Sequence, residues 1–253
     1  SRVSKPLKLF GAKFETNLGK LPITISGTNY PVPIKYFEKK GSAQCKSSIM
    51  LAALNTRGET CIKAKKSRDH TEILFKYLNL PIKILKKKNY DLIKIRGKKN
   101  FKPLNYRIPS DISSSAFFIV LTSLTKNSKL LIKNVNINPT RLGIITILKK
   151  MGVKIIFKNK KTYKGEKNAD IEIKSPKKLY SINCPISLNS GAIDEFLVIF
   201  LVAAKAKGIS YFKNLSELNQ KESPRLKWAK TILTKIGIKT ITTKNSIKIY
   251  GNP

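Results

Sequence analysis

The chain has 253 residues and a formal net charge of +37 at pH 7, because 51 lysines and arginines stand against 14 aspartates and glutamates. Hydrophobic residues make up 41% of the chain, which excludes a disordered polycation and allows a sizeable buried core. The longest apolar run, residues 196–204, is much shorter than the roughly 20 residues that a membrane-spanning helix needs, so we expect a soluble cytoplasmic protein without membrane association.

The excess of positive charge favours anionic partners, whether nucleic acid, an acidic membrane surface or phosphorylated metabolites. Lysines occur in every part of the chain, with short runs such as those at 86–88 and 98–99, and the aromatic residues do not form the pattern of an RNA-binding sheet. A solvated lysine surface is therefore the simpler interpretation. We expect no nucleic-acid partner.

The cysteines and the histidine do not indicate a metal site. Cys45, Cys61, Cys184 and the single histidine, His70, lack the spacing of zinc ligands and of a disulfide framework. We expect three buried free thiols and no metal.

The hydrophobic pattern repeats three times, over residues 30–99, 100–177 and 178–253. Each unit is predicted to contain an extended segment, an apolar helix, a strand, a second helix and two closing strands. The extended segments with their helices are predicted at 31–54, 104–124 and 179–204, the next strands at 58–64, 128–135 and 208–215, the second helices from Arg68, Arg141 and Arg225, and the last strands at 91–97, 169–175 and 245–251. Such alternation indicates an α/β fold.

Residues 1–29 fit the same pattern from the middle of a second helix onward. The chain thus begins inside a unit, and we expect a fragment that lacks N-terminal and C-terminal parts of a longer protein. Apolar stripes in the second helices are predicted to be core rather than site. They are Ile144, Ile145, Ile147 and Leu148 in one helix and Leu226, Ala229, Ile232 and Leu233 in another.

The three apolar helices are expected to begin at small polar residues. These are Gly41-Ser42, Ser113-Ser114-Ser115 and Ser190-Gly191. Such residues cap helices, and the same N–H groups can also bind an anion. At the first start, Ser42, Gln44 and Lys46 offer several donors within one turn, and Arg68 could add a bidentate contact.

Scarce acids occur beside basic residues in the third unit. Lys221, Glu222 and Arg225 are predicted to cluster at a helix start, with Ser223 as N-cap and Pro224 as the first helical residue. Positive groups there oppose the helix dipole, a cost that a bound anion would offset. A surface ion pair is the simpler alternative.

Asp194 is expected three residues into an apolar helix. Its simpler role is that of an acid in the first helical turn. A half-buried carboxylate beside lysine and arginine could instead accept a proton or orient a substrate hydroxyl.

Seven short strings carry a resemblance to a known family. They are SAQCKSS, TRGET, SRDHTE, SDISSSAFF, NPTRLG, AIDEF and ELNQKESPRL, in this order. In this order and spacing the chain resembles 3-phosphoshikimate 1-carboxyvinyltransferase, or EPSP synthase, over its whole length. Ala43 and SRDHTE resemble the class that includes glyphosate-tolerant bacterial enzymes.

The resemblance implies a two-lobed α/β (α+β) fold built from ββαβαβ-type units around approximate three-fold axes. By analogy, residues 1–109 would be part of the first lobe and residues 110–253 part of the second.

The resemblance also implies transfer of the enolpyruvyl group of phosphoenolpyruvate to the 5-hydroxyl of shikimate 3-phosphate, with no cofactor and no metal, in a monomer. Ser42, Gln44, Ser67 and Arg68 would hold shikimate 3-phosphate. Asp194 would bind the ring hydroxyls and accept the 5-hydroxyl proton, and Lys221 would contact the same hydroxyl. Glu222 would exchange a proton with the methylene carbon of phosphoenolpyruvate, and Arg225 would bind its phosphate.

Some family positions have no counterpart in these 253 residues, so we expect the fragment alone to be inactive. Two alternatives remain at this point. One is the sister enolpyruvyl transferase that acts on UDP-N-acetylglucosamine, which shares the repeat fold. The other is a basic nucleic-acid-binding repeat module, which predicts clustered charge and steep salt dependence.

Overall fold

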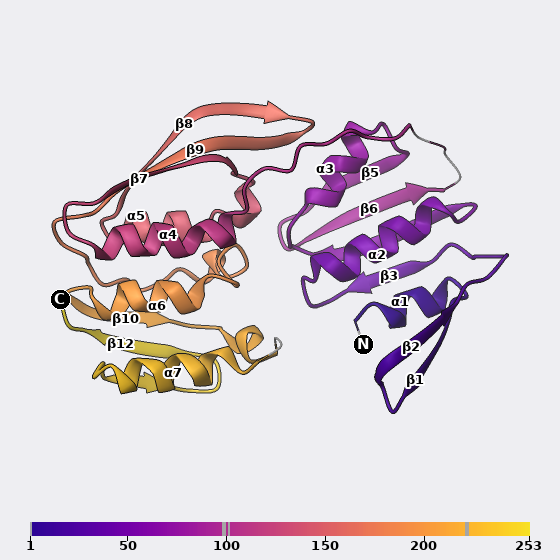
Figure 1. The fold of residues 1–253 in the computed structure, drawn as a ribbon. Coiled ribbons are helices and arrows are strands. Elements are labelled where there is room, and N and C mark those ends of the chain that lie inside the picture. The colour runs from indigo at the N-terminus through magenta and orange to yellow at the C-terminus, as the bar shows by residue number, and fades with distance from the viewer. Residues whose placement is uncertain (1, 98–99, 101, 221–222) are drawn as a thin grey trace. The chain divides into compact units, whose positions relative to one another are not determined.

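The computed structural model describes residues 2–97, 100, 102–220 and 223–253. The chain divides into two compact units, Ser1–Tyr106 and Arg107–Pro253 (Figure 1). This division lies close to the lobe boundary predicted at 109/110, and the assignment of the units to two lobes of an enzyme stays a prediction. Within the described part of the chain, no helix has the length and apolar character needed to cross a membrane.

The first unit holds one complete repeat and the end of another. Its elements are α1 (Ser4–Leu9), β1 (Lys13–Asn17), β2 (Lys20–Ser26), β3 (Lys35–Glu38), α2 (Ala43–Leu54), β4 (Glu59–Lys65), α3 (His70–Tyr77), β5 (Ile82–Lys86) and β6 (Tyr90–Arg96). β1 and β2 form an antiparallel hairpin after α1, as the pattern of residues 1–29 predicts. The four-stranded sheet has the order β3-β4-β6-β5, in which only β3 and β4 pair in parallel.

The core of this repeat lies between α2 and the sheet. α2 packs against β4 and β6 (Figure 1). Ile49 and Met50 of α2 and Ile62 and Ile93 of the two strands are fully buried. The strand residues lie at alternating positions that face the helix, and the helix residues lie on the face that packs on the sheet.

The second unit contains two repeats with the same topology. Its elements are α4 (Ile112–Leu124), β7 (Lys129–Asn136), α5 (Gly143–Lys150), β8 (Lys154–Tyr163), β9 (Glu166–Lys174), α6 (Phe196–Ala204), β10 (Gly208–Phe212), α7 (Arg225–Lys235), β11 (Thr240–Thr242) and β12 (Ile247–Gly251), with single 3₁₀ turns η1 (Pro139–Arg141), η2 (Ile186–Leu188) and η3 (Ser216–Gln220). The sheet orders are β7-β9-β8 and β10-β12-β11.

The extended segments at the start of these two repeats pair only briefly. Ser110 forms a parallel bridge with Val135, and Tyr180 and Asn183 form parallel bridges with Lys207 and Tyr211. Each bridge stands where β3 stands in the first unit. All three repeats therefore follow one plan, which confirms the predicted repeat and the α/β fold class.

α4 and α6 pack beside each other and join the two repeats of this unit into one core (Figure 1). Phe196, Phe200 and Phe212 form an aromatic cluster in that core, with ring centroids 5.0–5.9 Å apart. The predicted stripe of α5 is buried. In α7 the prediction fails at Ile232, which is 49% exposed because it lies beside the buried stripe rather than on it.

The cysteine prediction also needs one correction. Cys45 and Cys184 are buried free thiols, but Cys61 is only partly buried. Cys61 belongs to the outer row of β4, where side chains alternate between core and solvent, so the thiol meets solvent.

Candidate active site

The start of α2 is held against the loop that follows β4. Ser42 caps the helix by accepting a hydrogen bond from the Cys45 N–H at 3.3 Å, as predicted. Gly41 has φ +74°, and a Cβ there would lie 3.1 Å from the Lys66 carbonyl oxygen. Buried Glu38 accepts hydrogen bonds from the backbone N–H groups of residues 40 and 41 at 3.0 and 2.6 Å. The turn into α2 is thereby fixed beside residues 66–68.

Lys46 points into the protein, so its predicted role as an anion donor at the helix start is wrong. The side chain is 1% exposed and pairs with Glu72 at 2.5 Å. Its ammonium also donates to the Arg68 carbonyl oxygen at 2.8 Å. Burial raises the pKa of the Glu72 carboxyl, and the adjacent ammonium offsets this only in part. Lys46 therefore fixes the backbone that carries Arg68.

These contacts bring the start of α2 next to residues 66–68, the two segments that are predicted to bind shikimate 3-phosphate. Gln44 is exposed on the first turn of α2, and Arg68 is partly buried. The buried Ser67 hydroxyl oxygen finds no hydrogen-bond partner among the described residues. A buried hydroxyl normally has a partner, so this oxygen fits a ligand contact. The binding roles of Ser42, Gln44, Ser67 and Arg68 stay predictions.

Asp194 and Arg225 form an ion pair in the third repeat. The Arg225 Nη1 atom lies 3.2 Å from the Asp194 Oδ1 atom, and the two side chains are 22% and 25% exposed. The pair is thus partly desolvated and still reachable from solvent. The predicted neighbourhood of these two residues is correct.

The helical position of Asp194 differs from the prediction. α6 begins at Phe196, and Asp194 lies in the turn before it, where residues 192 and 195 donate to the carbonyls three residues earlier. The predicted start at Ser190-Gly191 fails because Gly191 lies against the backbone of Gly143, whose N–H donates to the Gly191 carbonyl at 3.1 Å. A tertiary contact thus replaces the first helical turn.

The start of α7 is shifted by one residue from the prediction. Pro224 is the N-cap and Arg225 the first helical residue, so Ser223 is not the N-cap. Asn219 instead accepts a hydrogen bond from the Leu226 N–H at 3.2 Å. Lys221 and Glu222 lie outside the described residues.

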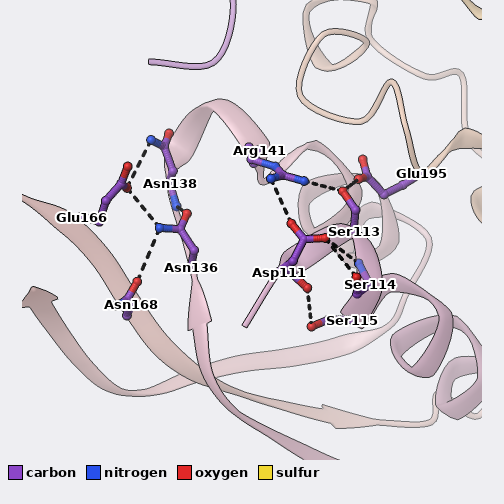
Figure 2. A network of polar contacts seen from close by, with 10 residues as sticks. All are labelled: Asp111, Ser113, Ser114, Ser115, Asn136, Asn138, Arg141, Glu166, Asn168 and Glu195. Atoms are coloured by element: carbon purple, nitrogen blue, oxygen red, sulfur yellow. Dashed lines mark hydrogen bonds and ion pairs between the residues drawn. The ribbon is translucent and has the colours of Figure 1, made fainter. Parts of the chain in front are cut away.

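The second repeat contains a polar network that the sequence analysis missed (Figure 2). Asp111, not a serine, caps α4 by accepting from the Ser114 N–H at 2.9 Å. The other oxygen of Asp111 pairs with Arg141 at 2.9 Å. Arg141 also donates to the Ser113 hydroxyl, which in turn donates to Glu195. A chain of polar contacts therefore connects α4, the loop before α5 and the turn before α6.

Asparagines fix the loop that carries Arg141 (Figure 2). Asn138 accepts from the N–H and the hydroxyl of Thr140 at 2.9 and 2.7 Å. Asn136 accepts from the Asn138 N–H at 3.0 Å and donates to Glu166 at 3.1 Å. This network could have been predicted from the alignment of the repeats, because Arg141 occupies the same position in its repeat as Arg68 and Arg225 do in theirs.

Comparison with known proteins decides the family. A family model described as EPSP synthase (3-phosphoshikimate 1-carboxyvinyltransferase) matches residues 1–252. The chain belongs to the EPSP synthase family. It is 41% identical over 251 residues to the 3-phosphoshikimate 1-carboxyvinyltransferase of Ruthia magnifica subsp. Calyptogena magnifica and 40% identical over 255 residues to that of Petrotoga mobilis.

The chain spans somewhat more than half of these relatives. The matches cover 99% of this chain but 57% of the Ruthia protein and 58% of the Petrotoga protein. The matches support membership of the EPSP synthase family, and they support neither the UDP-N-acetylglucosamine enzyme nor a nucleic-acid-binding module.

Solved structures agree with this assignment. EPSP synthase from Acinetobacter baumannii matches with a TM-score of 0.85 and 37% identity, covering 99% of this chain and 56% of that one. The enolpyruvyl transferase NikO from Streptomyces tendae matches with a TM-score of 0.66 and 15% identity, covering 99% of this chain and 58% of that one, which shows a shared fold alone.

Proposed function

We propose that the protein containing this chain transfers the enolpyruvyl group of phosphoenolpyruvate to the 5-hydroxyl of shikimate 3-phosphate. In this reaction the hydroxyl adds to C2 of phosphoenolpyruvate while a proton goes to the methylene carbon. Loss of phosphate and of a methyl proton then gives 5-enolpyruvylshikimate 3-phosphate. The proposal requires no metal and no organic cofactor.

One observation supports this proposal above the others. In this chain, which belongs to the EPSP synthase family, Asp194 is paired with Arg225 at 3.2 Å. The pair is partly exposed and lies near the starts of two helices. A carboxylate that is charged and held by a guanidinium can accept the proton of a substrate hydroxyl. Arg225 can exchange this partner for a phosphate oxygen, since its planar fork fits both.

The other roles in the proposal come from the family resemblance. Glu222 would exchange a proton with the methylene carbon, and Lys221 would contact the reacting hydroxyl. Ser42, Gln44, Ser67 and Arg68 would bind shikimate 3-phosphate. The buried Ser67 hydroxyl and the exposed Gln44 side chain support this part of the proposal.

We also propose that residues 1–109 and 110–253 belong to different lobes of the enzyme. Both substrates are phosphorylated and do not cross membranes, so the cytoplasm is the proposed location. A monomer is proposed because every residue assigned a role comes from one chain.

The test is phosphate release from phosphoenolpyruvate by the complete gene product that contains this chain, with and without shikimate 3-phosphate. Release should require shikimate 3-phosphate. Glu222→Gln should lower kcat by about 100-fold or more with little change in substrate affinity.

Arg225→Ala should mainly raise KM for phosphoenolpyruvate. Arg57→Ala is the matched control, because Arg57 is exposed in the turn between α2 and β4. A folded complete protein that releases no phosphate under these conditions would refute the proposed function.

A further inference from the structure

We propose that Glu195, Ser113 and Arg141 are positioning residues that hold the Asp194 carboxylate in place for catalysis. This inference rests on the proposed function, since it concerns the same proposed base. The polar network of Figure 2 lies mainly in the second repeat, whereas the carboxylate that it would position, Asp194, belongs to the third repeat.

The first step of the argument concerns Glu195, the residue next to Asp194. Glu195 is 4% exposed and stands at the N-cap of α6, yet its side chain makes no capping bond to that helix. It accepts a hydrogen bond from the Ser113 hydroxyl instead. A buried carboxylate is costly unless it is hydrogen-bonded, so this contact fixes where Glu195 points.

The second step concerns the other partners of Ser113. Its oxygen accepts from Arg141, whose second nitrogen pairs with Asp111 at 2.9 Å (Figure 2). Asp111 is itself fixed as the N-cap of α4. The rigid fork of Arg141 therefore ties the hydroxyl to a helix end rather than to a mobile side chain.

The third step concerns the backbone on the other side of Asp194. Gly191 accepts from the Gly143 N–H at 3.1 Å, and Gly143, two residues after Arg141, is the first residue of α5. The short segment from Arg141 to Gly143 thus holds the turn on both sides of Asp194. It contacts Gly191 before Asp194, and through Ser113 it contacts Glu195 after it. Asp194 lies between two fixed points and faces Arg225 at 3.2 Å.

Such preorganisation matters for a general base. A carboxylate that is displaced by about 1 Å from its productive position can lose on the order of 100-fold in rate. Removing the Ser113 contact leaves the backbone contact at Gly191 intact, so we expect a smaller loss of about tenfold.

The experiment is a double-mutant cycle on the complete gene product, with Ser113→Ala and Asp194→Asn as the two changes. Ser113→Ala should lower kcat about tenfold and leave both KM values within about twofold, because substrate contacts are unchanged. In the Asp194→Asn background the same change should have no further effect on kcat, because the group that it positions no longer accepts a proton.

Two further variants separate positioning from folding. Ser113→Thr keeps the hydroxyl and should restore most of the lost kcat. Ser123→Ala is the matched control on the same helix, since the Ser123 hydroxyl donates to the Ile119 carbonyl of α4 itself at 2.7 Å. It should leave kcat unchanged. If Ser113→Ala does not fold, Glu195→Gln replaces it in the cycle.

Equal losses of kcat in both backgrounds, or no loss from Ser113→Ala, would overturn the inference while leaving the proposed function intact. If the wild-type protein shows no turnover at all, the proposed function fails, and the positioning is then tested by the side-chain ¹⁵N NMR signal of Arg225. Ser113→Ala should broaden or shift that signal relative to Ser123→Ala. An unchanged signal would contradict the inference.

Discussion

The second and third repeats use the same pair of residue types for different purposes. In each, an arginine near the start of the second helix pairs with an aspartate near the start of the first. The pairs are Arg141 with Asp111 at 2.9 Å and Arg225 with Asp194 at 3.2 Å. Asp111 also caps its helix, whereas Asp194 lies in a turn two residues before α6 begins.

The difference shows how a repeat can turn a structural pair into a candidate site. In the second repeat the aspartate caps a helix and the arginine donates to a serine, so both contact other protein groups rather than a proposed substrate. In the third repeat the first helical turn is replaced by a contact between glycines, which moves the aspartate off the helix end. Asp194 there is paired with Arg225 and partly exposed, as its proposed role in proton transfer requires.

The largest expected effect comes from matched substitutions in the two pairs. Asp194→Asn should lower kcat by about 100-fold to 10,000-fold, because it removes the proposed proton acceptor. Its effect on stability should stay within about 1 kcal/mol, because the pair is partly exposed. Steady-state kinetics and urea denaturation of the complete gene product measure both quantities.

Asp111→Asn is the counterpart in the second repeat. It should lower stability by about 1 kcal/mol, through loss of the ion pair, and lower kcat by no more than about tenfold. Similar losses of kcat at the two positions would show that the two pairs do not differ in purpose.

The next largest effect concerns the glycines that displace Asp194 from its helix. A Cβ at Gly143 would lie 2.5 Å from the Gly191 carbonyl carbon and 2.6 Å from the Ala192 nitrogen. Both are backbone atoms that cannot rotate away, so Gly143→Ala should destabilise the fold by about 1–3 kcal/mol.

Urea denaturation of the complete gene product measures this change. Gly27→Ala is the control, since no atom lies within 4 Å of the added Cβ and its φ is not in the left-handed region. Equal denaturation midpoints for the two variants would show that the contact between the repeats is not tight.

The sequence predicts the repeat and its core well, because helical and alternating periodicity follow directly from which face is buried. It does not predict the start of α6. An apolar helix preceded by serine and glycine favours an early start, and only the approach of Gly143 in the folded chain prevents it. Element ends are often decided by such tertiary contacts.

The sequence predicts only those parts of the candidate site that do not depend on contacts between distant segments. Asp194 and Arg225 were found because acids are rare in this chain, and a rare acid beside an arginine is conspicuous. Lys46 was misassigned because nothing local shows that Glu72, far along the chain, neutralises it in the core. The network of Arg141 was missed because its partners come from three separate segments.

The smallest expected effect concerns the closing strands, where the two repeats carry opposite charges at one position. Glu172 of β9 accepts hydrogen bonds from Lys158 at 2.7 Å and Lys129 at 3.1 Å, which lower its pKa from an ordinary 4.5 to about 2. At the matching position of β12, Lys248 lies over the Tyr211 ring, 5.0 Å from its centroid.

Because the folded pKa of Glu172 is depressed, its stabilising contribution is present above about pH 4.5 and is lost as the pH falls toward about 2. Urea midpoints measured from pH 5 to pH 2 should therefore fall less in Glu172→Gln than in the wild type. Lys248→Ala removes no carboxylate and should leave the wild-type pH dependence unchanged. If Glu172→Gln keeps the full acid sensitivity of the wild type, the contacts of Lys129 and Lys158 do not lower the pKa of this carboxylate in solution. The two closing strands then differ in charge but not in their contribution to stability.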